Sequence, residues 1–271
     1  PTTEFISSMG SVPGMQIAHA GRKASAAPPW AKGVPLAIGD TAWGDPGWQT
    51  VAPSEVPLAD GWPTPHALSE TEIADVVTAF ADSARRTAQA GFKVLEIHGA
   101  HGYLIHSFLS SLSNQRNDGY GGDRAGRMRF ALEVTEAVRA AWPDELPLFF
   151  RISAIDGYGW EIEDSVALAT ALKERGVDVV DCSAGGITGA PAFRAQDNGK
   201  PLAKSGQRPL GFQVPYSEAI RRDGNVEASR GRRIDVGNGH RRLRQAFQRQ
   251  PDGARLRQHV EQLHGVAVAD G

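Results

Sequence analysis

The residues best suited to chemistry lie in one segment, His98–Tyr103 (HGAHGY), which directly follows a β-prone run. Two imidazole N–H groups can hold a carbonyl oxygen and accept its developing negative charge, and a nearby phenol can deliver a proton. Two other interpretations stay open: a polar loop with incidental histidines, or a His-x-x-His metal site. We predict no metal, because Cys182 is remote and Glu96, the nearest carboxylate, is expected to point into the strand.

A second polar group contains Gln16, His19, Arg22 and Lys23, at the end of an earlier strand. A glutamine amide both donates and accepts hydrogen bonds, which suits a heteroaromatic ring edge such as the flavin pyrimidine. The alternative is a solvated basic loop. Arg151 stands near the end of a further strand, where a guanidinium can give fixed positive charge to a reduced, anionic ring. Its alternative is an arginine held by a salt bridge inside the fold.

Local patterns predict the elements that position these residues. Strands are expected at 15–18, 92–97, 146–152 and 177–182. Helices are expected from the capping box Ser69-Glu70-Thr71-Glu72 to Gly91, over 127–142 and over 164–175. Strands alternating with amphipathic helices indicate parallel βαβ units, in a doubly wound sheet or a barrel. In both folds the carboxyl ends of the strands surround the site.

Three stretches are expected to be irregular. Residues 28–65 are rich in Pro, Gly and Trp and predict a long excursion between the first strand and the first helix. Residues 114–123 predict a loop that supports the fold. Gly185-Gly186 allows either a plain turn or a close approach to a ligand.

The composition excludes several classes of protein. The chain has 271 residues, a net charge of −2 and one cysteine, so disulfides and cysteine-held iron–sulfur clusters within the chain are excluded. Nothing indicates a nucleic-acid or membrane partner, and we expect a cytoplasmic protein acting on a small molecule. The start resembles no signal peptide and lacks Met, so residue 1 is expected to lie inside a longer parent sequence.

Taken together, the motifs resemble the Old Yellow Enzyme family, in its bacterial branch of NADPH-dependent ene-reductases and xenobiotic reductases. The resemblance covers about residues 10–222. It rests on these segments: Gly14–Lys23, Glu96–Leu104, Phe108–Ser110, Ser113-Asn114, Arg116, Asp118, Tyr120–Gly122, Arg151–Ser153 and Gly211–Tyr216. The segment from the histidines to Tyr120-Gly121-Gly122 is the most specific of them.

The resemblance implies a (β/α)₈ TIM barrel with FMN across its mouth and NADPH or NADH as hydride donor. Gln16 would bind the flavin pyrimidine and Arg151 would stabilise the reduced ring. His98 and His101 would hold the oxygen of an α,β-unsaturated carbonyl or a nitro compound. Tyr103 would protonate the α-carbon after hydride reaches the β-carbon, and Lys23 would line the same pocket. Full-length relatives are expected to be homo-oligomers.

The sequence also departs from that family. Only strands three to six of the barrel are recognisable, so we predict a partial barrel over 1–222 and an atypical tail over 223–271. Eleven arginines fall between Arg221 and Arg257, and the tail has no lysine and no convincing β-prone run. We predict that it is translated out of frame or disordered, and the alternative is a basic RNA-binding arm. Without the phosphate site of strands seven and eight, we expect this chain to bind FMN weakly or not at all, as an inactive remnant would.

Overall fold

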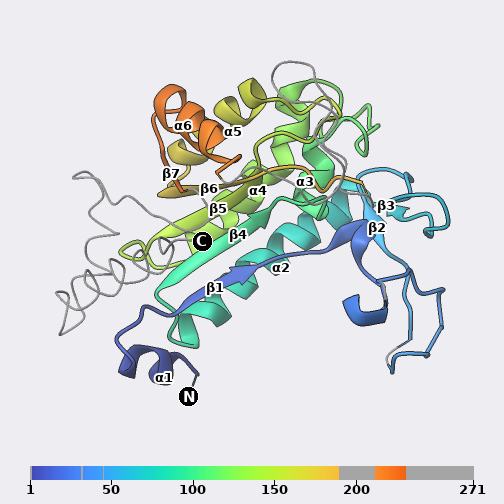
Figure 1. Cartoon of the computed structure of the whole chain (residues 1–271), viewed down its shortest axis with the longest axis horizontal. Helices are drawn as coiled ribbons and strands as arrows, with labels where there is room; N and C mark the ends of the chain where they lie inside the picture. The colour runs from blue at the N-terminus through green and yellow to red at the C-terminus, as the bar shows by residue number, and fades with distance from the viewer. Residues whose placement is uncertain (1, 32, 45, 189–210, 230–271) are drawn as a thin grey trace, which may run out of the picture.

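The computed structural model contains a five-stranded parallel sheet, and it describes residues 2–31, 33–44, 46–188 and 211–229 (Figure 1). The strand order is β1-β4-β5-β6-β7, so each strand lies beside the next main strand of the chain, as in a (β/α)₈ barrel. The fold is therefore part of such a barrel. The four predicted strands are confirmed with ends shifted by one or two residues. The bounds are β1 Gly14–Ile17, β4 Val94–Gly99, β5 Leu148–Ser153, β6 Val179–Ser183 and β7 Glu227–Ser229.

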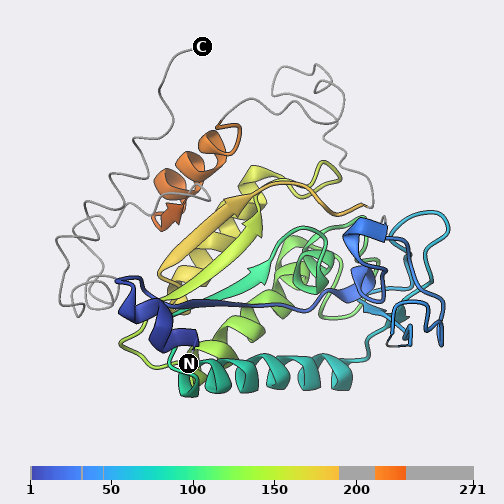
Figure 2. The ribbon, with the colours of Figure 1, turned by 60° about the horizontal axis from the view of Figure 1, so that its bottom comes forward.

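Helices pack against one face of this sheet and form the main core. Strand residues such as Ile97, Phe150 and Val180 alternate onto that face and join helix residues such as Phe130 and Leu168, all fully buried. Figure 2 shows α2 and α4 running side by side beneath the sheet. The helices are α1 Thr2–Ser8, α2 Glu70–Gln89, α3 Leu104–Leu109, α4 Arg124–Ala141, α5 Ile162–Glu174 and α6 Val214–Asp223.

The predicted helix signals act as expected in α2. The Ser69 hydroxyl accepts from the backbone N–H of Glu72, and the Glu72 carboxylate accepts from the backbone N–H of Ser69. At the other end, Gly91 has a φ of +86°, the left-handed conformation in which glycine stops a helix. The α4 helix begins three residues before the predicted start, because Asp123 caps it through the N–H of Gly126.

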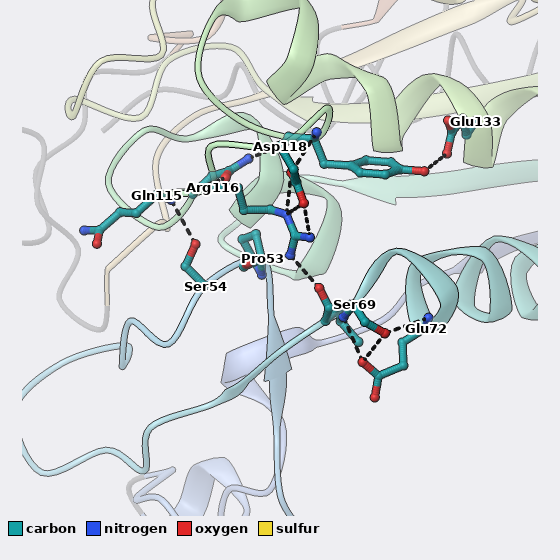
Figure 3. Close-up of polar contacts among 11 residues, drawn as sticks. Pro53, Ser54, Ser69, Glu72, Gln115, Arg116, Asp118 and Glu133 are labelled. Carbon is teal, nitrogen blue, oxygen red and sulfur yellow. Dashed lines mark hydrogen bonds and ion pairs between the residues drawn. The ribbon is translucent and has the colours of Figure 1, made fainter.

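Residues 28–65 form the expected excursion, which lies beyond the carboxyl ends of β1 and β4 (Figure 2). Two short elements lie within it, a 3₁₀ turn at Pro29–Ala31 and the strand β2 Val51–Ala52. A second 3₁₀ turn, Gly21–Lys23, precedes the excursion, and the strand β3 His66–Ala67, which pairs with β2 in parallel, follows it. Arg116 attaches the excursion to the loop after α3 (Figure 3). Its guanidinium donates to the carbonyls of Pro53 and Leu68 and pairs with Asp118. This loop therefore supports the fold, as predicted.

The sheet continues beyond residue 222, where the sequence pattern suggested no further strand. The β7 strand pairs with β6 in parallel, with Ala228 opposite Val180. It was missed because three residues are too few to show a period. Residues 230–271, which hold most of the predicted atypical tail, lie outside the described residues. Within the described part, no helix is long and apolar enough to cross a membrane.

Candidate active site

The sheet face opposite the helices is layered from apolar to polar along the strands. Near the strand starts, Phe149 and Val179 pack together with Val94. The next layer carries Glu96 and an ion pair in which Arg151 Nε lies 3.2 Å from Asp181 Oδ2. Beyond it, at the carboxyl ends, come His98 and a group of serines. Charged side chains on the inner face are costly to bury, so this pattern marks a site for polar chemistry.

The predicted trio His98, His101 and Tyr103 comes together at the end of β4. The ring centres of His98 and His101 are 5.2 Å apart, and the Tyr103 ring lies edge-on to His98 at 4.9 Å. Strand β4 carries His98 directly, whereas His101 and Tyr103 belong to the turn that leads into α3. Two imidazoles and a phenol therefore face one small region of space.

His98 is held in its neutral form. Its side chain is buried, and burial, helped by the charges of His101 and Arg151, lowers its pKa to about 4. Its Nδ1 is buried and has no hydrogen-bond partner in the described residues. A neutral imidazole carries one N–H and one bare nitrogen, so His98 can offer a hydrogen bond to an oxygen at pH 7.

Gln16 and Arg151 lie close to this trio, as the sequence predicted. Gln16 pairs across the sheet with Glu96, two residues before His98, which is about 6.6 Å along the strand. Arg151 lies opposite His98 itself. Gln16 Nε2 donates to Glu96, which leaves its carbonyl oxygen and second N–H for another partner. The glutamine and the arginine thus flank the same edge of the site.

The sequence did not predict the carboxylates that surround Gln16 and Arg151. Glu96 does not lie within the strand plane but faces the site beside Gln16, and burial, followed by the charge of Asp181, raises its pKa. The ion pair with Asp181 also bears out the structural alternative for Arg151. Both interpretations of Arg151 are compatible, since one carboxylate only partly screens a guanidinium that is 31% exposed.

Lys23 reaches the same loop but bonds to the backbone. Its Nζ donates to the carbonyl of His101 at 2.7 Å and to the carbonyl of Gly186. Burial, followed by the charge of Arg22, lowers the pKa of Lys23 to about 8. Arg22, also buried, donates to the carbonyls of Val56 and Ile187. Through these contacts Arg22 and Lys23 connect the segment after β1 to the excursion and to the loops after β4 and β6. They do not form a solvated basic loop.

Two serines that shape the site were not among the site residues predicted from the sequence. Ser153 Oγ accepts from the N–H of His101 at 3.0 Å and donates to the carbonyl of Gly185 at 2.7 Å. Ser183 Oγ is hydrogen-bonded to His101 Nε2 at 2.6 Å. Serine at a strand end is common, so only the position at the end of a parallel strand could have suggested them.

Gly185-Gly186 makes a close approach, to a neighbouring loop of the chain itself. A methyl group on Gly186 would lie 2.7 Å from His101 Cα, and one on Gly102 would lie 2.3 Å from the Gly186 carbonyl oxygen. Both glycines also have positive φ, +87° and +75°. The loops after β4 and β6 therefore pack together only because neither carries a side chain at the contact.

These residues fit the edge of a flavin ring. The carbonyl oxygen and second N–H of Gln16, together with the guanidinium of Arg151, which is 31% exposed, offer donors and an acceptor at one end of the sheet. No cluster of three His, Cys, Asp or Glu side chains that could hold a metal ion occurs among the described residues. The site therefore places groups suited to a polar heteroaromatic ring beside the imidazoles of His98 and His101.

Comparisons with known proteins find relatives among flavin oxidoreductases. The sequence profile of the NADH:flavin oxidoreductase / NADH oxidase family matches residues 1–240. An NADPH dehydrogenase of a Geobacillus species is 38% identical over 224 residues, 82% of this chain and 55% of that protein. One of Bacillus cytotoxicus is 44% identical over 191 residues, 70% of this chain and 49% of that protein.

Solved structures agree on the fold. The Old Yellow Enzyme homologue from Zymomonas mobilis has a TM-score of 0.60 and 25% identity, over 83% of this chain and 58% of its own. Morphinone reductase also has a TM-score of 0.60, with 24% identity over 83% of this chain. The chain spans about half the length of the relatives that it matches.

Proposed function

Because the chain belongs to the NADH:flavin oxidoreductase / NADH oxidase family, which includes Old Yellow Enzyme, we propose that it carries the ring and substrate site of an FMN-dependent NAD(P)H oxidoreductase. The proposed substrate is an α,β-unsaturated carbonyl or nitro compound, whose C=C bond is reduced. The observation that supports this most is the neutral His98 beside His101 and Tyr103, next to Gln16 and Arg151.

Each side chain has a role that follows from its chemistry. Gln16 and Arg151 hold the flavin, the amide at the pyrimidine edge and the guanidinium as compensation for negative charge on the reduced ring. When bound, FMN supplies the hydride chemistry, with NADPH or NADH as the donor. His98 and His101 donate hydrogen bonds to the substrate oxygen and accept the charge that develops there. Tyr103 delivers a proton to the α-carbon.

Lys23 acts differently in this proposal from the role that the family resemblance implied. Its two carbonyl partners occupy two of its three N–H groups, so it supports the His101 loop and has at most one donor left for the substrate pocket. Its support of the loop does not depend on which substrate is bound.

The second candidate, carried over from the sequence analysis, is an inactive remnant that cannot hold FMN. A titration with two probes separates the candidates. If this chain holds the ring but lacks the phosphate anchor, FMN and riboflavin should bind with similar, weak affinity. We expect their dissociation constants, measured by quenching of flavin fluorescence, to agree within about threefold, because the phosphate contributes nothing.

Matched variants locate the ring. Gln16→Leu should raise the dissociation constants of both flavins at least tenfold. Leaving a polar group of the ring edge without a partner costs about 1.4 kcal/mol, which corresponds to that factor. Gln49→Leu is the control, since Gln49 donates only to carbonyls of the excursion. No binding of either flavin would favour the remnant. Stoichiometric FMN in the purified chain, bleached by NADPH, would show that the phosphate anchor is present and that the enzyme is complete.

A further inference from the structure

The turn that carries His101 has a backbone conformation that L-residues avoid. His101 has a φ of +60° and Gly102, the next residue, a φ of +75°. The left-handed region costs a residue with a Cβ about 1–2 kcal/mol, so His101 stays there only if neighbouring groups hold it. The direction of its imidazole depends on this turn.

Three side chains from three different elements bind the backbone of this turn. The His101 N–H donates to Ser153 Oγ on β5 at 3.0 Å, and the His101 carbonyl accepts from Lys23 Nζ at 2.7 Å. The third contact is the Gly102 N–H, which donates to His106 Nδ1 on α3 at 2.7 Å. Each of these three successive polar groups of the backbone therefore has a side-chain partner.

His106 is the least expected of the three. It is 0% exposed and lies within α3, every residue of which is buried, including Ile105 and Leu109. Burial favours an apolar residue at such a position, and Nε2 of this ring has no partner among the described residues. The bond to Gly102 is the one interaction that an imidazole makes here and that leucine could not.

We propose that His106 is a positioning residue that holds the left-handed His101–Gly102 turn through its Nδ1 and so sets the angle between the two imidazoles of the site. The acceptor role requires the proton of the ring to be on Nε2. The positioning role concerns the backbone alone. Its effect on catalysis rests on the proposed function, but the geometric role does not.

The first test uses the unmodified full chain and requires no flavin. Nitrogen-15 NMR of the histidine rings reports which nitrogen carries the proton. We expect the Nε2–H form for His106, with a coupling through the hydrogen bond between the Gly102 amide nitrogen and Nδ1. A proton on Nδ1 would overturn the proposal, because that nitrogen could then accept nothing.

The second test compares two substitutions of the same ring. His106→Leu removes the acceptor, and His106→Asn keeps one, because Asn Oδ1 is as many bonds from the backbone as Nδ1. We expect exchange of the Gly102 amide proton to accelerate at least tenfold in the leucine variant and to stay within about threefold in the asparagine variant. The His101 Cα chemical shift should leave its left-handed value only in the leucine variant.

Equal protection of Gly102 in both variants would show that His106 only fills space, and would refute the proposal. If the leucine variant does not fold, the asparagine variant decides, since rapid exchange of Gly102 in a folded asparagine variant also refutes it. Failure of the flavin titrations would leave these results unchanged, so the two proposals fail independently.

Discussion

The contact between the loops after β4 and β6 predicts a large and specific cost for one methyl group. In Gly186→Ala, the new Cβ would lie 2.7 Å from His101 Cα, 3.0 Å from its carbonyl carbon and 3.2 Å from its Cβ. Backbone atoms cannot move aside as a flexible side chain can. The residue also has a φ of +87°, which an alanine tolerates poorly.

The two effects add. The left-handed backbone costs alanine about 1–2 kcal/mol, and forcing a methyl group into a packed contact costs about 1–3 kcal/mol. We therefore expect Gly186→Ala to lower the free energy of unfolding by about 2–5 kcal/mol. This loss is a large part of the total of about 5–15 kcal/mol that is usual for folded domains.

A matched control separates the two effects. Gly122 has a φ of +72°, and a Cβ there would meet nothing within 4 Å, so Gly122→Ala should cost only the backbone strain of about 1–2 kcal/mol. Urea unfolding of both variants, followed by circular dichroism, measures the difference. Equal losses in both would refute the contact, and with it the argument that these glycines permit the two loops to pack.

Three further predictions concern charge. The folded pKa values of His98 and His106 are about 4 and about 3, so between pH 6.5 and about 4 these histidines bind protons in the unfolded chain but not in the folded chain. The free energy of unfolding, measured in urea, should therefore fall as pH falls. It should fall less steeply in His106→Asn. Asp181→Asn should lower the raised pKa of Glu96, because one of its causes is the charge of Asp181, and carbon-13 NMR of the carboxyl group measures it; an unchanged pKa would contradict the layer described above. Arg116→Lys should cost about 1–3 kcal/mol in thermal or urea unfolding, because an ammonium group lacks the planar fork that binds Asp118 on one side and the Pro53 and Leu68 carbonyls on the other. Arg124→Lys is the control and should cost less than about 0.5 kcal/mol, since its side chain is 50% exposed. Similar losses in the two variants would refute the attachment of the excursion by Arg116.

Sequence patterns were sufficient wherever the cause is local. The capping box at Ser69 and the stop at Gly91 set α2 through bonds and backbone angles within a few residues. Four strands were found from their apolar runs, and their carboxyl ends meet because the strands are parallel. From these patterns we correctly predicted that Gln16, His98 and Arg151 lie at the same edge of the sheet. The strand β7 escaped it because its signal is three residues long.

The sequence by itself determined the main helices and four of the strands, their parallel βαβ units and several of the groups that face the site, because these depend on periodicity and on short-range chemistry. Only the tertiary structure decided their partners. Lys23 meets the carbonyl of Gly186, 163 residues away, and Ser153 meets the N–H of His101, 52 residues away. Such contacts depend on strand register and loop packing, which place side chains to within an ångström and leave no periodic trace in the chain.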